Sequence, residues 1–177
     1  NPILYTEEGA RVYPGYATDV ITDLTLEWLK NRPKEKPFFA MYHHKAPHRE
    51  WTPSSKYAAE FRAKTFPEPA TLSDTYQGRT DAIREQQQHV FRDLTRRDLK
   101  LEPPADLKGK ERQAWLGTKP TEVEITENGA RKVLTGTKLD AWKFQRYMQD
   151  YLACIQSVDD NVGRVLDWLK AEKLREN

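Results

Sequence analysis

A short apolar run that stops abruptly at basic and imidazole side chains is the feature that most limits how this chain can fold. Residues 38–42, Phe-Phe-Ala-Met-Tyr, have the length and composition of a buried strand covered on both faces. The residues that follow include five with basic or imidazole side chains: His43, His44, Lys45, His48 and Arg49. In an open α/β sheet, ligands bind beyond the carboxyl ends of the strands. The run therefore predicts an α/β fold with a functional loop at the end of this strand.

The side chains of this loop suit an anion. Lys45 offers a compact positive charge, Arg49 a planar fork of donors, and His48 a proton that can be exchanged near neutral pH. Sulfate or phosphate is the ligand that this combination predicts. The alternative interpretation is a solvated loop whose histidines lie on the surface.

The segments on either side of the loop have the periods of regular structure. Strands at 3–5 and 11–13 form an expected hairpin, and a helix is expected from Thr18 or Asp19 to Pro33. A short helix is expected at 54–63. The longest helical pattern recurs every three or four residues, at Trp142, Tyr147, Met148, Tyr151, Leu152, Ile155, Val158, Val162, Val165, Leu166 and Leu169.

The middle of the chain has a different character. A helix is expected within 74–88, and strands at 122–126 and 131–135 are separated by a turn that contains Asn-Gly, a strong hairpin signal. Between the expected helix and the first of these strands, a basic face is formed by Arg92, Arg96 and Arg97. This face is either solvated surface or a contact for an anionic sugar. We expect residues 70–137 to be an insertion that shapes access of the substrate.

Three segments, in the same order, resemble the sulfatase family. Residues 38–53 resemble its Lys-Ala-Pro-His segment, especially in the branch of N-acetylglucosamine-6-sulfatases and bacterial glycosaminoglycan or mucin sulfatases. Residues 15–23 resemble the family's Gly-Tyr-x-Thr-Asp stretch, and 151–166 its Tyr-x-x-x-Val-x-x-Val-Asp-x-x-Val-Gly helix. Residues from about 55 to 135 match loosely, most clearly at 66–72.

The resemblance implies an α/β fold, as a partial alkaline-phosphatase-like sulfatase domain with a mixed sheet flanked by helices and incomplete at both ends. Residues 1–69 and 138–177 would then be parts of one catalytic domain. The implied activity is hydrolysis of sulfate esters of sugars or amino sugars, with a sulfated carbohydrate as partner. The alternatives are a phosphate or phosphonate ester hydrolase of the same superfamily and a non-catalytic remnant that binds sulfated glycans.

The resemblance also implies roles for the loop residues. His48 aligns with the family histidine that contacts the sulfate and is a candidate general acid. Lys45 lies where the family places a basic or imidazole group near the substrate. Arg49 and His44 are further candidates for binding sulfate or substrate.

The nucleophile and the metal of the family have no counterpart in the sequence. A formylglycine arises from cysteine in Cys-x-Pro-x-Arg, but Cys154 has neither Pro nor Arg at that spacing and is expected in the core. Asp159, Asp160 and Asn161 are adjacent on a helix and cannot all face one ion, so Asp159 is expected to bond to a neighbouring loop. Formylglycine and the ligands of calcium are therefore expected outside this chain. On this interpretation the chain is an internal segment of a sulfatase and is inactive by itself.

Composition limits the partners. A net charge of +2 without blocks of like charge gives no support for nucleic acid binding, and no run approaches the roughly 20 apolar residues of a membrane span. With 37% hydrophobic and 32% charged residues, the chain is lean for an independent domain of 177 residues. The compartment cannot be read from the residues, although the family implies the periplasm, the exterior or the lysosome.

Overall fold

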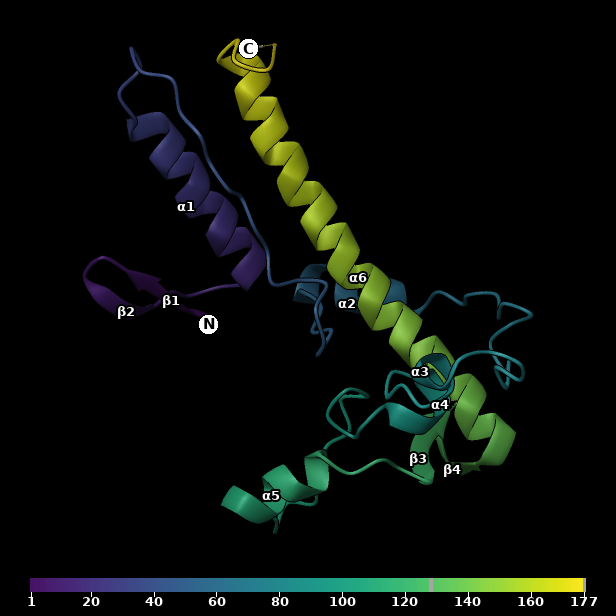
Figure 1. Ribbon diagram of the computed structural model, residues 1–177. Coiled ribbons are helices and arrows are strands. Elements are labelled where there is room, and N and C mark those ends of the chain that lie inside the picture. Colours follow the sequence, from purple (N-terminus) through teal and green to yellow (C-terminus); the bar gives the residue numbers. More distant parts are fainter. Residues whose placement is uncertain (128, 177) are drawn as a thin grey trace. The chain divides into compact units, whose positions relative to one another are not determined.

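The computed structural model describes residues 1–127 and 129–176 and divides the chain into two compact units (Figure 1). Unit 1 comprises Asn1–Phe61 and Tyr151–Asn177, and unit 2 comprises Arg62–Asp150. The elements in chain order are β1 (Ile3–Thr6), β2 (Gly9–Val12), α1 (Ala17–Asn31), α2 (Ser55–Arg62), α3 (Asp81–Arg84), α4 (Val90–Asp93), α5 (Gly109–Leu116), β3 (Glu122–Glu127), β4 (Ala130–Thr135) and α6 (Gly136–Ala171). The mixture of helices and strands agrees with the predicted α/β class.

Unit 1 is built on α1 and the C-terminal part of α6. Thr18, Thr22 and Leu29 of α1 are buried on one face, because steps of four and seven residues return to the same side of a helix. Val20 is also buried, on the opposite side of α1. Polar contacts fasten the two helices: Asn161 Nδ2 donates to Asp19 Oδ1 at 2.7 Å and Arg164 donates to Asp23 at 2.5 Å. The predicted hairpin at the start of the chain is confirmed, with β1 and β2 antiparallel.

The strand predicted at 38–42 is not formed. The strands of the described residues belong to two antiparallel pairs, β1–β2 and β3–β4. Residues 38–42 are extended and run back along α1 (Figure 1), with Phe39 84% and Met41 72% exposed. A strand needs a neighbour that takes its backbone hydrogen bonds, and an apolar sequence cannot supply one by itself.

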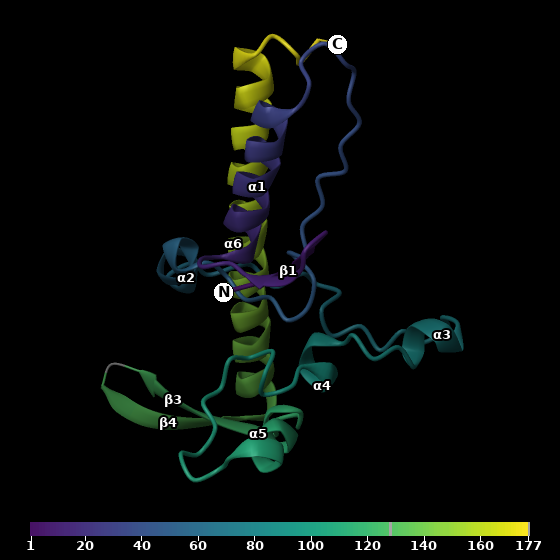
Figure 2. The same ribbon diagram turned by 90° about the vertical axis from the view of Figure 1, so that its left-hand side faces the viewer.

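Unit 2 contains the predicted hairpin of β3 and β4, which is confirmed with Val123 opposite Leu134. Figure 2 shows this hairpin beside the first turns of α6, and Val123, Leu134 and Leu139 form a small buried core there. In the predicted turn, Gly129 has a φ of +79°, which favours glycine, while Asn128 lies outside the described residues.

The helix predicted within 74–88 is much shorter than expected, because it covers only Asp81–Arg84. Tyr76 and Gly78 have φ values of +55° and +77°, which a right-handed helix cannot contain. The predicted helices at 54–63 and along the C-terminal pattern are confirmed as α2 and α6. The assignment of 70–137 as an insertion stays a prediction.

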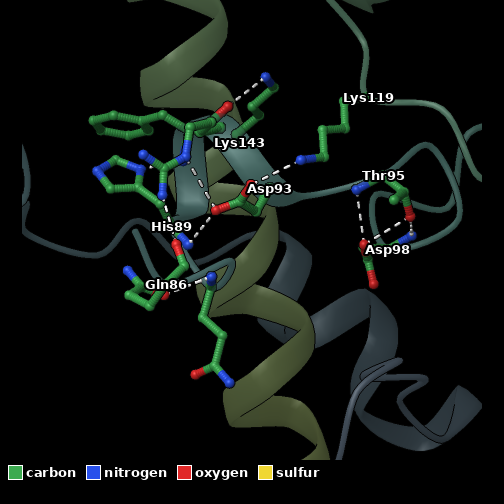
Figure 3. A network of polar contacts seen from close by, with 10 residues as sticks. Gln86, His89, Asp93, Thr95, Asp98, Lys119 and Lys143 are labelled. Carbon is green, nitrogen blue, oxygen red and sulfur yellow. Dashed lines mark hydrogen bonds and ion pairs between the residues drawn. The ribbon is translucent and has the colours of Figure 1, made fainter. Parts of the chain in front are cut away.

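Several basic residues of unit 2 take part in a polar network around Asp93 (Figure 3). The carboxylate is 4% exposed and accepts hydrogen bonds from Lys119 Nζ at 2.8 Å and from the His89 backbone N–H at 3.0 Å. Burial alone would raise the pKa of Asp93, but the bonds from Lys119 and His89 outweigh it and lower that pKa. Lys143, 5% exposed, donates to the Phe91 carbonyl at 2.8 Å. This network stabilises the loops of unit 2.

The predicted basic face of unit 2 is also engaged within the chain. Arg92 contacts Asp93, the Arg96 guanidinium lies 5.0 Å from the centre of the Trp115 ring, and Arg97 donates to Gln113 at 2.8 Å. These contacts favour a structural role over a contact with an anionic sugar.

Candidate functional site

Lys45 and His48 lie on one pocket of unit 1, with a volume of about 300 Å³. The N-terminal end of α1 forms one side with Tyr16 and Thr18, and the loop that follows the extended segment forms another. Cys154 reaches the pocket from α6. The pocket therefore brings together side chains that are far apart in the sequence.

A tight turn holds Lys45 and His48, the two predicted site residues of this pocket, on the same loop. The His48 backbone N–H donates to the Lys45 carbonyl at 2.9 Å. The His48 ring also contacts the Arg49 carbonyl through Nδ1. A carbonyl oxygen can only accept, so Nδ1 carries the proton in this contact and Nε2 is left to exchange a proton or to face an anion.

His44 and Arg49 do not line this pocket. The His44 ring packs edge to face on Tyr42, with ring centres 4.5 Å apart, and its two nitrogens are buried without a hydrogen-bond partner among the described residues. Burial lowers the pKa of His44, against a weaker opposite effect of Asp19. A neutral His44 is poorly suited to hold an anion. A role for His44 or Arg49 in binding substrate stays a prediction.

Tyr16 and Thr52 also line the pocket, although the sequence did not predict them as site residues. The Tyr16 hydroxyl donates to the Thr52 carbonyl at 3.0 Å, and both residues line the pocket. Burial, followed by the neighbouring Cys154, raises the pKa of Tyr16 to about 12. Tyr16 stood within a segment of family resemblance, but neither its spacing nor its residue type indicated a contact with residue 52.

Of the adjacent Asp159 and Asp160 on α6, Asp160 makes a structural contact within unit 1. Asp159 is exposed, and its bond to a neighbouring loop stays a prediction. Its neighbour Asp160 accepts hydrogen bonds from Lys56 Nζ at 2.8 Å and from the Tyr57 hydroxyl, both on α2. The bonds from Lys56 and then Tyr57 lower the pKa of Asp160 to about 2. A helix turns by 100° per residue, which is why residue 160 and not 159 faces α2.

Over residues 1–127 and 129–176, no group of three or more His, Cys, Asp or Glu side chains could hold a metal ion. The Cys154 side chain, on α6, is buried with 2% of its surface exposed. This confirms the core position that the apolar residues around it in the helical pattern predicted. No helix in the same ranges is long and apolar enough to cross a membrane.

Comparisons with known proteins match this chain along nearly its whole length. It is 41% identical over 180 residues to an N-acetylglucosamine-6-O-sulfatase of Bacteroides thetaiotaomicron, and the match covers 94% of this chain and 32% of that protein. The solved structure of BT4656 in complex with its substrate D-glucosamine-2-N,6-O-disulfate superposes with a TM-score of 0.78 at 34% identity, covering 98% of this chain and 38% of the other. This chain thus spans about a third of the length of these relatives. Residues 3–177 match the sulfatase family, and the chain belongs to that family.

Proposed function

We propose that this chain forms the sulfate-binding part of the active site of a longer enzyme that hydrolyses the 6-O-sulfate ester of a glucosamine derivative. The observation that carries the proposal is the placement of Lys45 and His48 on one pocket. The substrate class is supported by the relatives, one an N-acetylglucosamine-6-O-sulfatase and one solved with a 6-O-sulfated glucosamine. Because this chain spans a third of such proteins, the rest of the site belongs to other residues.

His48 and Lys45 have separate tasks in this reaction. When a sulfate ester is cleaved, the departing sugar oxygen needs a proton, and an imidazolium can provide it from Nε2 while Nδ1–H stays on the Arg49 carbonyl. The ammonium of Lys45 attracts the sulfuryl oxygens, which carry the negative charge of the substrate. Arg49 and His44 would contribute only if substrate binding rearranged the loop.

We assign no nucleophilic or metal-dependent step to this chain. The family's formylglycine would supply the attacking oxygen and its calcium would hold it, but the described residues contain no matching set. The chain therefore contributes binding of sulfate and transfer of a proton.

Replacing the histidine in the complete enzyme tests this function. His48→Ala should lower kcat/KM for a 6-O-sulfated N-acetylglucosamine by about 10²–10⁴-fold, the usual contribution of a general acid. The matched control is His43→Ala, because His43 is exposed on the same segment and does not line the pocket. Unchanged turnover in His48→Ala would show that the assignment is wrong.

Two further measurements separate the alternatives. Faster turnover of the matching 6-phosphate ester than of the sulfate ester would identify a phosphate ester hydrolase. Binding of the sulfated sugar without any turnover by the complete protein would identify a glycan-binding protein. Lys45→Gln should mainly raise KM, because it removes an attraction that the ground state and the transition state share.

A further inference from the structure

We infer that α1 holds the loop of Lys45 and His48 at both of its ends, and that Tyr16 and Thr22 are positioning residues for this site. Thr22 contacts Tyr42 just before the loop, and Tyr16 contacts Thr52 just after it. Neither contact is part of the chemistry assigned above. The catalytic consequence rests on the proposed function, whereas the structural consequence does not.

The first anchor is a partly buried pair of hydroxyl groups in unit 1. Thr22 is 0% exposed, and its hydroxyl donates to the Thr18 carbonyl of its own helix at 2.8 Å. Its single proton is therefore committed, and the Tyr42 hydroxyl 2.6 Å away must be the donor to Thr22 Oγ1. Burial raises the pKa of Tyr42, so this donor stays protonated at neutral pH. The bond fixes the last residue before His43.

The second anchor starts at the first turn of α1. Gly15 has a φ of +115°, a conformation that glycine adopts easily, and it precedes Tyr16 at the start of the helix. From there the Tyr16 hydroxyl donates to the Thr52 carbonyl at 3.0 Å. With a pKa of about 12, Tyr16 keeps its proton under all ordinary conditions. The bond fixes the first residues after the loop.

The two anchors act on a short loop. Between Tyr42 and Thr52 lie nine residues, 43–51, and inside them the His48 amide is bonded to the Lys45 carbonyl. Fixing both ends removes most of the conformations that such a segment could otherwise sample. Catalytic geometry is sensitive at this scale, since a misplacement of about 1 Å can cost about 10²-fold in rate.

The helix that carries the anchors is itself held in place. Asp19, between Tyr16 and Thr22, accepts the hydrogen bond from Asn161 of α6. The stretch from Gly15 to Asp19 thus provides the turn, the second anchor and the attachment to α6 within five residues. This division of tasks accounts for a stretch that the chemistry of sulfate cleavage leaves unexplained.

Hydrogen exchange in the 177-residue chain tests the anchors without any assay of activity. In Tyr16→Phe and Thr22→Val, which remove only the hydroxyl contacts, the His48 amide should exchange at least about tenfold faster than in the unmodified chain. The matched control is Thr25→Val, because Thr25 bonds to Ile21 on the same helix and does not line the pocket. Thermal unfolding of all three variants shows whether an increase is confined to the loop. Equal exchange of the His48 amide in the anchor variants and the control would overturn the inference.

Kinetics of the complete enzyme then separate positioning from simple stabilisation. Tyr16→Phe should lower kcat about tenfold with a smaller change in KM, and Thr25→Val should leave both unchanged. Normal kcat in Tyr16→Phe with a severe loss in His48→Ala would overturn the positioning role while the proposed function stands. Faster loop exchange combined with normal turnover in His48→Ala would keep the anchors and reject the proposed function.

Discussion

Residues 38–42 and residues 43–52 follow each other in the chain and differ in how their side chains are used. The first segment is apolar, yet Phe39 and Met41 are largely exposed. The second is rich in charge, and it is flanked by two hydrogen bonds, one between Tyr42 and Thr22 of α1 and one from Tyr16 to Thr52. Five of its residues line a pocket: Lys45, Ala46, His48, Glu50 and Thr52.

The difference lies in where the partners come from. A buried strand needs neighbouring strands and a covering layer, which the described residues do not provide for 38–42. The loop needs only a few hydroxyl and carbonyl groups, and α1 supplies them from within the same unit. Directed hydrogen bonds can therefore order a polar loop next to an apolar segment in which Phe39 and Met41 stay exposed.

A large effect is expected from the contact that fastens α1 to α6. The buried Asn161 amide donates to Asp19 and to the Ser157 carbonyl, and its oxygen accepts from Arg164 at 2.8 Å. Asn161→Ala should lower the free energy of unfolding by about 2–3 kcal/mol, because partly buried hydrogen bonds to two charged side chains and a buried one to a carbonyl are lost. Urea unfolding of the 177-residue chain measures this change.

Asp159, two residues before Asn161, provides the control for that substitution. Asp159→Ala alters an exposed position of the same helix and should change the free energy of unfolding by less than about 0.5 kcal/mol. Equal effects of the two substitutions would mean that the contacts of Asn161 do not hold α1.

A smaller effect, dependent on pH, is expected at the boundary between the two segments. Burial lowers the pKa of His44 in the folded state, so the unfolded chain binds the proton more readily. Stability is then complete above a pH of about 6.5, and it falls as the pH drops from there towards the lower pKa of the folded state. The slope cannot exceed about 1.4 kcal/mol per pH unit for one group.

Urea unfolding between about pH 7.5 and about pH 5.5 measures this dependence. His44→Gln should flatten it, whereas His43→Gln should leave it intact, because His43 is exposed. A pH dependence that persists in His44→Gln would place its origin in another group. Asp160 is excluded from this range, since its pKa of about 2 confines its loss of stability to pH values below about 4.

Local patterns predicted those parts of the fold whose interactions are local. The helical period predicted α1, α2 and α6, and the Asn-Gly turn predicted β3 and β4. The strand at 38–42 failed because pairing depends on other strands, which a pattern within five residues cannot reveal. The helix within 74–88 was overestimated because the chain turns at Tyr76 and Gly78.

For the candidate site too, the sequence predicted the local features and not the contacts between distant residues. Residue types alone identified a loop suited to an anion, and the structure places Lys45 and His48 on one pocket. They could not tell that the His44 ring packs on Tyr42 and does not line this pocket. Nor could they identify Tyr16, because its bond to Thr52 joins residues 36 positions apart through a backbone carbonyl that any residue would offer.

The smallest effect sharpens the comparison most directly, because it tests whether the exposed apolar side chains of residues 38–42 contribute to the stability of this chain. Phe39→Ser should change the free energy of unfolding of the 177-residue chain by less than about 0.5 kcal/mol, since the ring is exposed. Leu29→Ala, at a buried position of α1, should cost about 2–5 kcal/mol in the same urea experiment. A large loss in Phe39→Ser would show that the ring is buried. If residues 38–42 join a sheet in the complete enzyme, as their composition predicts, Phe39→Ser should cost about 3–5 kcal/mol there, and the contrast between the two proteins would measure what the missing neighbours contribute.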